Sequence, residues 1–234
     1  MYILPVISNQ FFIPASPAGQ ILLTERRIHA GIGPTRPFRA LRGLPDLREL
    51  NMGQDKPVPT AAECYEIIRR HNMLDNIVRH SKRVMEVSLA LVDNLRDPSI
   101  VQRSLVLSAA LLHDIAKTRT IGTRERHDLI GGQIMREMGY DAIAEIVESH
   151  VVFEGFDPDG ALEEREIVFY ADKRVMHDRI VSIDDRVDDL VKRYGINERI
   201  VKLITENKEF ILRLENKLRG FLARDIEEIV SGVC

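Results

Sequence analysis

The chain has 234 residues, of which 44% are hydrophobic and 29% charged, and its net charge is −3. These values are ordinary for a soluble globular protein, and the charge gives no electrostatic case for binding nucleic acid or a membrane surface. No stretch approaches the roughly 20 apolar residues that a membrane-spanning helix needs. The two cysteines, Cys64 and Cys234, cannot build a disulfide framework, so we expect a cytoplasmic protein.

Residues 1–59 differ in composition from the rest of the chain. Eight of the ten prolines lie there, mixed with glycines and arginines. Few helices would survive such a composition, so we predict a poorly ordered Pro/Arg-rich N-terminal extension. Its arginines could touch a partner or a polyanion, but a solvated tail is the simpler interpretation.

From Thr60 onward the apolar pattern is helical. Thr60 and Glu63 have the spacing of a capping box, which opens the first helix. Apolar residues at three- and four-residue steps, with proline and glycine stops, predict helices over 60–73, 76–95, 98–117, 128–138, 141–153, 163–181, 184–194 and from 197 to 217 and beyond. The pair Gly131-Gly132 suggests close helix packing. We predict an all-α bundle, with residues 60–195 as its main domain and 196–234 as a C-terminal helical extension.

Six polar side chains interrupt apolar helix faces in this region. The run LLHDIAKTR at 111–119 carries an adjacent histidine and aspartate through an apolar stretch. Taken singly, each histidine fits a hydrogen-bonded core residue, and each aspartate fits a cap or an ion pair. Burying several such groups unpartnered would cost on the order of several kcal/mol apiece, so together they call for a common compensator. One or two divalent metal ions would serve, held by His80, His113, Asp114, His127, His150 and Asp172.

The order of these residues resembles the HD-domain superfamily of metal-dependent phosphohydrolases. LLHDIAK is close to the motif often written His-Asp-Ile-Gly-Lys, with Ala116 where that subgroup has glycine. The additional His127 and His150 resemble the dinuclear branch of the superfamily. The stretches HDLIGGQIMREMGY, ESHVVF and ADKRV are similar to the bacterial branch that includes symmetrical diadenosine tetraphosphate hydrolases. The resemblance covers about residues 74–193 and implies an HD-domain helical bundle.

The resemblance also implies a division of the metal ligands. His80, His113, Asp114 and Asp172 would hold one ion, and His127 and His150 would serve a second ion, with Asp114 bridging the two. A mixed nitrogen and oxygen donor set suits iron, manganese or zinc better than calcium, and magnesium is also compatible.

Basic residues near this motif are candidates for substrate contacts. Lys117 follows His113 by one helical turn, so we expect Asp114 and Lys117 to be catalytic, with Lys117 binding a substrate phosphate. Further substrate-binding candidates are Lys173 and the loop residues Arg119, Arg124 and Arg126. For the loop arginines a merely solvated role is equally compatible, and His177 has no partner in the pattern.

The predicted function is hydrolysis of a phosphoester or phosphoanhydride in a nucleotide or other small phosphorylated metabolite, by metal-activated hydroxide. Two alternatives stay open. One is a di-iron oxygenase of the HD type, and the other is a non-catalytic nucleotide-binding regulator. The sequence leaves the oligomeric state open, and we expect substrate specificity to come from the loops at 119–126 and 154–160.

Overall fold

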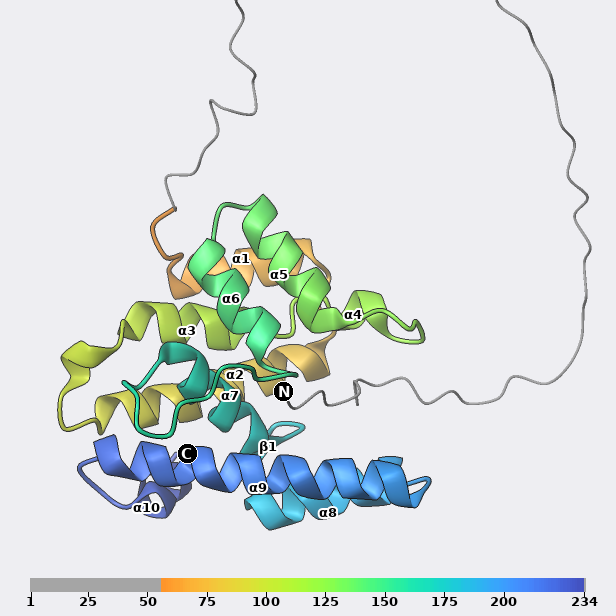
Figure 1. Ribbon diagram of the computed structural model, residues 1–234. Helices are drawn as coiled ribbons and strands as arrows, with labels where there is room; N and C mark the ends of the chain where they lie inside the picture. The colour runs from red at the N-terminus through yellow and green to blue at the C-terminus, as the bar shows by residue number, and fades with distance from the viewer. Residues whose placement is uncertain (1–55, 234) are drawn as a thin grey trace, which may run out of the picture. The chain divides into compact units, whose positions relative to one another are not determined.

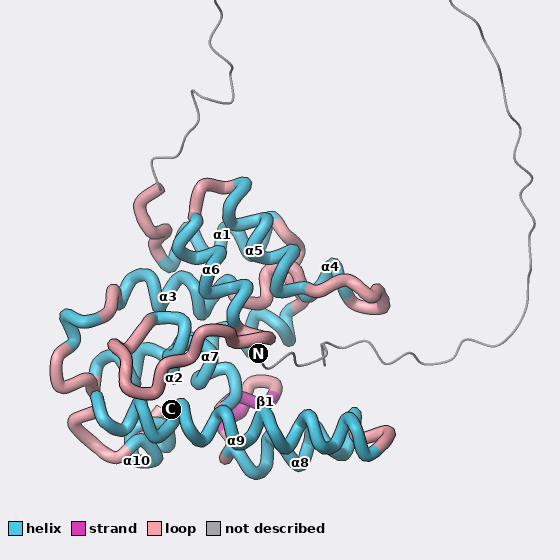
Figure 2. Tube along the Cα trace, viewed as in Figure 1, coloured by secondary structure: helices cyan, strands magenta, loops and turns pink. Residues whose placement is uncertain are grey.

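The computed structural model describes residues 56–233, which form a helical body with one short hairpin (Figures 1 and 2). The predicted all-α class is confirmed. The elements are α1 (Ala61–Arg70), α2 (Asp75–Asp93), the 3₁₀ turn η2 (Pro98–Ile100), α3 (Arg103–Leu112), α4 (Lys117–Thr120), α5 (His127–Glu137), α6 (Asp141–Ser149), α7 (Glu164–Lys173), β1 (Val175–Met176), β2 (Arg179–Ile180), α8 (Ile183–Tyr194), α9 (Glu198–Phe221) and α10 (Ile226–Ser231). Within the described residues, no helix has the length and apolar character to cross a membrane.

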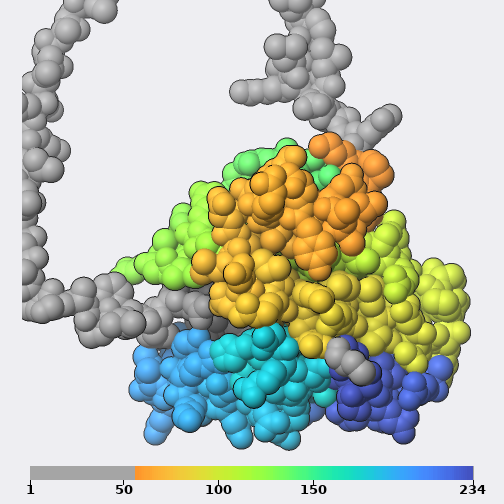
Figure 3. Space-filling view, turned by 180° about the vertical axis from the view of Figure 1, so that it is seen from behind, coloured from red at the N-terminus to blue at the C-terminus, as the bar shows by residue number. Residues whose placement is uncertain are grey.

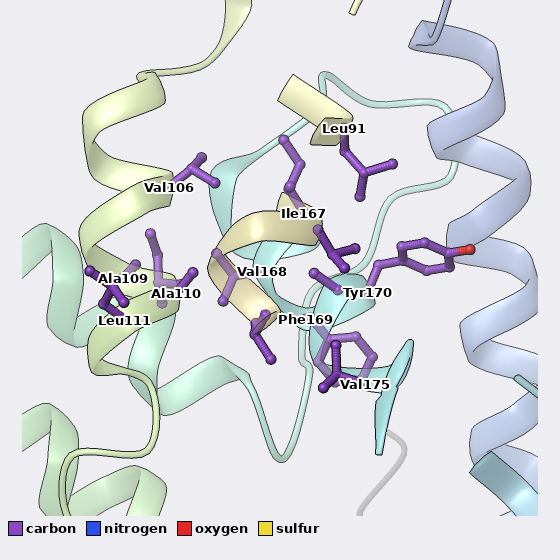
Figure 4. Close-up of a cluster of buried hydrophobic side chains, with 14 of the residues drawn as sticks. Leu91, Val106, Ala109, Ala110, Leu111, Ile167, Val168, Phe169, Tyr170 and Val175 are labelled. Carbon is purple, nitrogen blue, oxygen red and sulfur yellow. The ribbon is translucent and has the colours of Figure 1, made fainter. Parts of the chain in front are cut away.

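Helix α7 runs through the centre of the hydrophobic core. Its residues 167–171 are all buried in succession, which is the mark of a helix packed on every side. It contacts α2, α3, α6 and α9, and Figure 4 shows Ile167 and Val168 among side chains of the neighbouring helices. The ring of Tyr170 points the other way, toward α9, where its hydroxyl donates to Glu215 Oε2 at 2.8 Å. The core therefore fixes α7 between the N-terminal helices and the C-terminal helix pair.

The predicted capping box at the start of α1 is present. The Glu63 amide donates to Thr60 Oγ1, and the Thr60 amide donates to Glu63 Oε2 at 2.7 Å. Helix α1 packs on α3 and buries the thiol of Cys64 completely. Figure 3 shows α1 and α2 from behind, above the blue C-terminal helices.

Helices α5 and α6 approach each other closely at the two glycines. A Cβ added to Gly131 would lie 2.8 Å from Val147 Cγ1, and one added to Gly132 would lie 2.4 Å from the Glu148 side chain. Such separations are shorter than any relaxed carbon–carbon contact, so only glycine fits here without movement. The predicted close helix packing at Gly131-Gly132 is confirmed.

The C-terminal helices are held to the rest of the body by two ion pairs, of which Lys217–Glu166 is buried. Lys217 on α9 donates to Glu166 Oε1 at 2.7 Å and to the Ala161 carbonyl at 2.9 Å, and the Lys217 and Glu166 side chains are only 3% and 2% exposed. Arg174 pairs with Glu227 of α10 at 2.8 Å. The boundary predicted at residue 195 stays a prediction, as does the predicted disorder of residues 1–59, of which 1–55 lie outside the described residues.

Two predicted helices are shorter than expected. The single helix expected over 98–117 is wrong: α3 ends at Leu112, and residues 113–116 form turns before α4. The cause is His113, whose Nδ1 lies 2.8 Å from the Ala110 carbonyl, an acceptor that a continuing helix would use for its own amide. Helix α6 was expected to end near residue 153, but it ends at Ser149. The cause is again a histidine, because His150 Nδ1 lies 2.5 Å from the Val147 carbonyl.

The helix expected over 163–181 is also wrong beyond residue 173. Residues 175–180 form the antiparallel hairpin β1–β2, with Val175 opposite Ile180. The two-residue turn contains His177 at φ 59°, in the left-handed region that such tight hairpins require. Two strand residues on each side are too few to produce a visible alternation, so the pattern continued to resemble a helix.

Two glycines with different surroundings, Gly131 at the α5–α6 contact and Gly220 on α9, should respond in opposite ways to substitution by alanine. We expect Gly131→Ala to lower the free energy of unfolding by about 1–3 kcal/mol, because its methyl group overpacks against Val147. Gly220 lies on α9 with nothing within 4 Å of its Cβ position, so Gly220→Ala should stabilise by up to about 1 kcal/mol. Urea unfolding of both variants measures this; equal effects would contradict the close approach at Gly131.

The buried Lys217–Glu166 pair predicts a large loss of stability when one partner is removed. Lys217→Met should lower the free energy of unfolding by about 3–5 kcal/mol, because the Glu166 carboxylate would remain buried without its cation. Lys202→Met on the same helix is the matched control, since Lys202 is 77% exposed and should cost less than about 1 kcal/mol. A loss for Lys217→Met no larger than for this control would show that α9 does not dock as described.

Candidate metal centre

The six predicted metal ligands come together in one buried cluster. They are contributed by five helices or helix ends: His80 by α2, His113 and Asp114 by the end of α3 and the turn after it, His127 by the start of α5, His150 by the end of α6, and Asp172 by α7. All six are at most 8% exposed. The fold thus brings together side chains that are far apart in the sequence: His80 and Asp172 are 92 positions apart and in hydrogen-bond contact.

One group of atoms surrounds Asp172 and one oxygen of Asp114. His80 Nε2 lies 3.0 Å from Asp172 Oδ1, and His113 Nε2 lies 3.7 Å from the same oxygen. Asp114 Oδ2 lies 3.4 Å from His113 Nε2 and 3.9 Å from His80 Nε2. The donor atoms of His80, His113 and Asp114 lie close enough together to hold one cation, and Asp172 approaches the two histidines of this group.

A second group of atoms surrounds the other oxygen of Asp114. Asp114 Oδ1 lies 3.2 Å from His127 Nε2 and 3.5 Å from His150 Nε2. The two imidazole nitrogens are 3.1 Å apart. Asp114 therefore offers one oxygen to each group, which is the arrangement expected of a carboxylate that bridges two ions.

Backbone carbonyls set the orientation of three of the histidine rings. Nδ1 of His80 lies 2.8 Å from the His177 carbonyl, and His113 and His150 point Nδ1 at Ala110 and Val147. A ring that donates its Nδ1 hydrogen to a carbonyl presents an unprotonated Nε2 on its other side. In each of these rings Nε2 is the atom that faces the cluster, as it is in metal-binding histidines.

The cluster leaves polar atoms that nothing in the described chain satisfies. His113 Nε2 and Asp114 Oδ1 are buried and have no hydrogen-bond partner. The Nε2 atoms of His127 and His150 lie 3.1 Å apart, where one ring can donate to the other or both can contact a cation. Buried polar atoms without partners are costly, and a cation removes the cost for all of them at once. The cluster is thus compatible with divalent metal binding.

The electrostatics of the cluster keep both carboxylates ionised. Burial acts to raise the pKa of Asp114, but the charges of Lys117 and His113 outweigh it and hold that pKa well below its ordinary value. Burial likewise opposes ionisation of Asp172, and Lys173 is the main cation that keeps its pKa well below the ordinary value. Ionised carboxylates are the form that binds metals.

The histidines divide into two electrostatic environments. Burial lowers the pKa of His150 to about 4, so its ring is neutral near pH 7. Burial also opposes the charging of His113, but the carboxylates of Asp114 and Asp172 raise its pKa above the ordinary value. The Asp114–Asp172 side of the cluster therefore attracts positive charge, which a metal ion would supply.

The two predicted lysines lie at different depths. Lys117 Nζ donates to Asp114 Oδ2 at 2.8 Å, and its side chain is 29% exposed, so it reaches from the cluster toward solvent. Lys173 Nζ donates to Asp172 Oδ2 at 2.6 Å and to the His150 carbonyl at 2.8 Å, with a side chain only 12% exposed. Lys173 therefore contacts ligand residues of both groups, and its predicted contact with substrate stays a prediction.

The predicted loop arginines are not drawn into the cluster. The Arg126 guanidinium is paired with the fully buried carboxylate of Asp128, with Nε 3.1 Å from Oδ1. Arg119 and Arg124 are exposed. Their contact with substrate stays a prediction.

A cavity of about 510 Å³ opens onto the cluster at His80, Asp114 and His127. Its volume is within the ~300–1,000 Å³ of small-molecule sites. The remaining lining comes from Lys117, the start of α2, the hairpin turn and one face of α8, namely Asn76, Ile77, Arg79, His177, Asp178, Arg186, Leu190, Arg193 and Tyr194. The loops at 119–126 and 154–160, which we expected to set specificity, are absent from this lining.

Sequence reasoning missed two parts of the site. His177 contributes a backbone carbonyl, and a backbone atom leaves no residue-type signal. The cationic face of α8 does carry a signal, because Arg186, Leu190 and Arg193 follow each other at four- and three-residue steps. That spacing predicts a shared face but not that the face is turned toward the cluster.

One family model and several relatives match part of the chain. The HD domain family matches residues 77–188, just under half of the chain. An uncharacterised protein of Methanocaldococcus jannaschii is 29% identical over 144 residues, which cover 56% of this chain and 84% of that protein. No solved structure gave a significant match.

Two further relatives are named tRNA (cytidine(56)-2'-O)-methyltransferase. The protein from Picrophilus torridus is 27% identical over 76% of this chain, and the one from Thermoplasma volcanium is 27% identical over 74% of it. The matches span only about half the length of these relatives, 52% and 51% respectively.

The family match contains all six cluster residues, from His80 to Asp172. The narrower resemblance to diadenosine tetraphosphate hydrolases stays a prediction. The family match, the order of the motifs and the convergence of their side chains together support membership of residues 77–188 in the HD-domain superfamily.

Proposed function

We propose that this protein is a metal-dependent phosphohydrolase that cleaves a phosphoester or phosphoanhydride in a small metabolite, with nucleotides as the leading class. The observation that carries the proposal is the position of Asp114, whose two oxygens face two separate groups of buried nitrogen and oxygen donors. The HD domain, which typically belongs to metal-dependent hydrolases, supports the same reaction type. Cytoplasmic location is part of this proposal.

The ligands divide between two ions in this proposal. His80, His113, Asp114 and Asp172 hold the first, and Asp114, His127 and His150 hold the second. Imidazole and carboxylate donors in this ratio favour iron, manganese or zinc, and magnesium is compatible with the carboxylates. When bound, such a pair supplies Lewis acidity and a hydroxide nucleophile near neutral pH.

The chain's own residues orient the substrate around that centre. Lys117 extends from Asp114 into the cavity, where its ammonium group can bind an equatorial phosphate oxygen. Burial opposes its charged form, but Asp114 and Asp172 raise its pKa above the ordinary value, so it stays cationic through the neutral range. Charge that grows on the phosphoryl oxygens during in-line attack is thereby stabilised where it develops.

Two alternatives are distinguished by direct assay. A di-iron oxygenase would use the same six ligands; the cations Arg79, Lys117, Arg186 and Arg193 that line the cavity favour an anionic substrate, which includes phosphorylated substrates of an oxygenase, so the assay decides between them. A non-catalytic nucleotide-binding regulator has no need for a complete ligand set. The matched relatives' methyl transfer is not part of the proposal, because the matches cover only half of those proteins.

The direct test is a metal analysis followed by a phosphatase panel of nucleotides, dinucleoside polyphosphates and cyclic dinucleotides. We expect one or two transition-metal ions per chain and release of phosphate or a nucleotide product. Consumption of oxygen by the anaerobically iron-loaded protein, without phosphate release from any substrate, would favour the oxygenase instead.

The bridging role of Asp114 predicts loss of both metal and activity on substitution. Asp114→Asn should reduce metal content to at most one ion and lower kcat/KM by at least roughly 100-fold, because one oxygen donor and the bridging charge are lost. Asp93→Asn is the matched control, since Asp93 pairs with Arg103 at the surface. If Asp114→Asn keeps the metal and turns over as fast as the parent, the ligand assignment is wrong.

Substitution of the two lysines should impair different properties, catalysis for Lys117 and metal binding for Lys173. Lys117→Met should keep the metal and lower kcat/KM by roughly 10–100-fold, because a phosphate-binding cation is lost from the cavity. Lys173→Met should instead weaken metal binding by roughly 10–100-fold, because Asp172 and the His150 carbonyl lose the ammonium that positions them. Metal titration by calorimetry separates the two; identical metal affinities in both variants would contradict the positioning role of Lys173.

A further inference from the structure

One part of the cavity wall is a cationic face of α8. Arg186, Leu190 and Arg193 line the cavity from successive turns of this helix. Residues four and three positions apart share one helix face, so the two guanidinium groups extend from the same side of α8. The cavity is thus lined both by residues of the cluster, His80, Asp114 and His127, and by the arginines of α8.

Asp189 holds both arginines in position. Arg193 Nε donates to Asp189 Oδ1 at 2.9 Å, and a second bond to Oδ2 makes the pair bidentate. Arg186 Nη1 lies 3.7 Å from Asp189 Oδ2. One carboxylate therefore faces two guanidinium groups and cannot satisfy all their donors, so the pair retains a net positive charge.

Arg186 has a buried donor without an acceptor. Its Nε has no hydrogen-bond partner in the described part of the chain. The side chain is only 19% exposed, so water has little access to this donor. A desolvated guanidinium N–H without an acceptor is costly, and a phosphate oxygen is the ligand whose geometry fits a guanidinium fork. Arg186 and Lys117 both line the cavity, so the two cations face a common space.

The cavity is larger than one phosphate group requires and is partly apolar. Its volume of about 510 Å³ leaves room beyond a phosphoryl group at the cluster. Ile77, Leu190 and Tyr194 add apolar and aromatic surface next to the arginines. A ligand that joins two phosphate groups to an organic moiety matches this order of charge and apolar surface.

We propose that Arg186 and Arg193 form a second phosphate subsite, so that the preferred substrates are phosphoanhydrides with one phosphoryl group at the metal cluster and the next phosphate on α8. This inference rests on the proposed function and narrows its substrate class. In the reaction, the oxygen of a water molecule bonds to the phosphorus at the cluster, and the bridging P–O bond breaks. The leaving phosphate keeps the bridging oxygen and departs from the arginines, and the proton released goes to solvent.

The first experiment measures binding without turnover. Pyrophosphate and orthophosphate are titrated into the metal-free full-length protein by calorimetry, in buffer without divalent ions. We expect pyrophosphate to bind at least roughly tenfold more tightly than orthophosphate, and Arg186→Met to abolish that preference. Arg186→Lys keeps the positive charge but lacks the paired N–H donors of a guanidinium group. It should therefore retain part of the preference for pyrophosphate.

Lys192→Met is the matched control for the binding experiment. Lys192 lies on the same helix next to Arg193 but is exposed and does not line the cavity, so its substitution should leave the preference for pyrophosphate intact. Equal binding of the two anions by the parent protein would overturn the subsite, as would an unchanged preference in Arg186→Met and Arg193→Met. Thermal unfolding of each variant shows whether it is folded. If Arg186→Met is not folded, Arg186→Lys replaces it in the binding experiment.

The second experiment measures specificity in the manganese-loaded protein. The ratio of kcat/KM for ADP to that for AMP should fall at least roughly tenfold in Arg186→Met, relative to the parent and to Lys192→Met. An equal loss for both substrates would overturn the subsite while the proposed function stands. If the parent hydrolyses neither nucleotide nor any other phosphate ester, the proposed function fails, and the binding experiment still decides the subsite.

Discussion

The structure around the candidate site depends on the burial of one carboxylate, that of Asp114. A carboxylate that is 1% exposed is stable only if both of its oxygens are compensated. Lys117 and His113 compensate one oxygen, while the other faces His127 and His150 without a hydrogen bond. The second oxygen is thus left without a hydrogen bond by the five helices that close around this residue, an arrangement compatible with a bound cation.

The ligands are presented by the ends of helices more than by their faces. His113 and His150 each end a helix by turning Nδ1 back to a carbonyl three residues earlier, which fixes the ring and aims Nε2 at the cluster. Helix termini have carbonyl groups without amide partners, so a histidine placed there satisfies the backbone and is oriented by it. The same two bonds account for both the helix boundaries and the direction of the ligands.

Sequence alone predicted the helical class and the inward direction of the six candidate ligands, because both rest on local periodicity and residue type; that these residues bind a metal stays a prediction. His80 on the stripe of Ile77 and Val84 is an example, since a position on an apolar face implies an inward side chain. The hairpin at 175–180 and the role of the His177 carbonyl could not be predicted, because both depend on how α7 ends and on what packs beside it. The arginine face of α8 was visible as a spacing, but its direction depends on the docking of α8 against α9, which is a tertiary property.

Helix α7 links the site to the C-terminal helices through consecutive residues. Asp172 lies in the cluster and Lys173 bonds the His150 carbonyl, while Tyr170 donates to Glu215 on α9 and Arg174 pairs with Glu227 on α10. Because the helix is packed on every side, these contacts cannot adjust independently of one another. The position of Asp172 is therefore determined in part by α9 and α10, although neither helix lines the cavity. The C-terminal helices, which lie outside the matched HD segment, are in this sense part of the structure that positions the metal ligands.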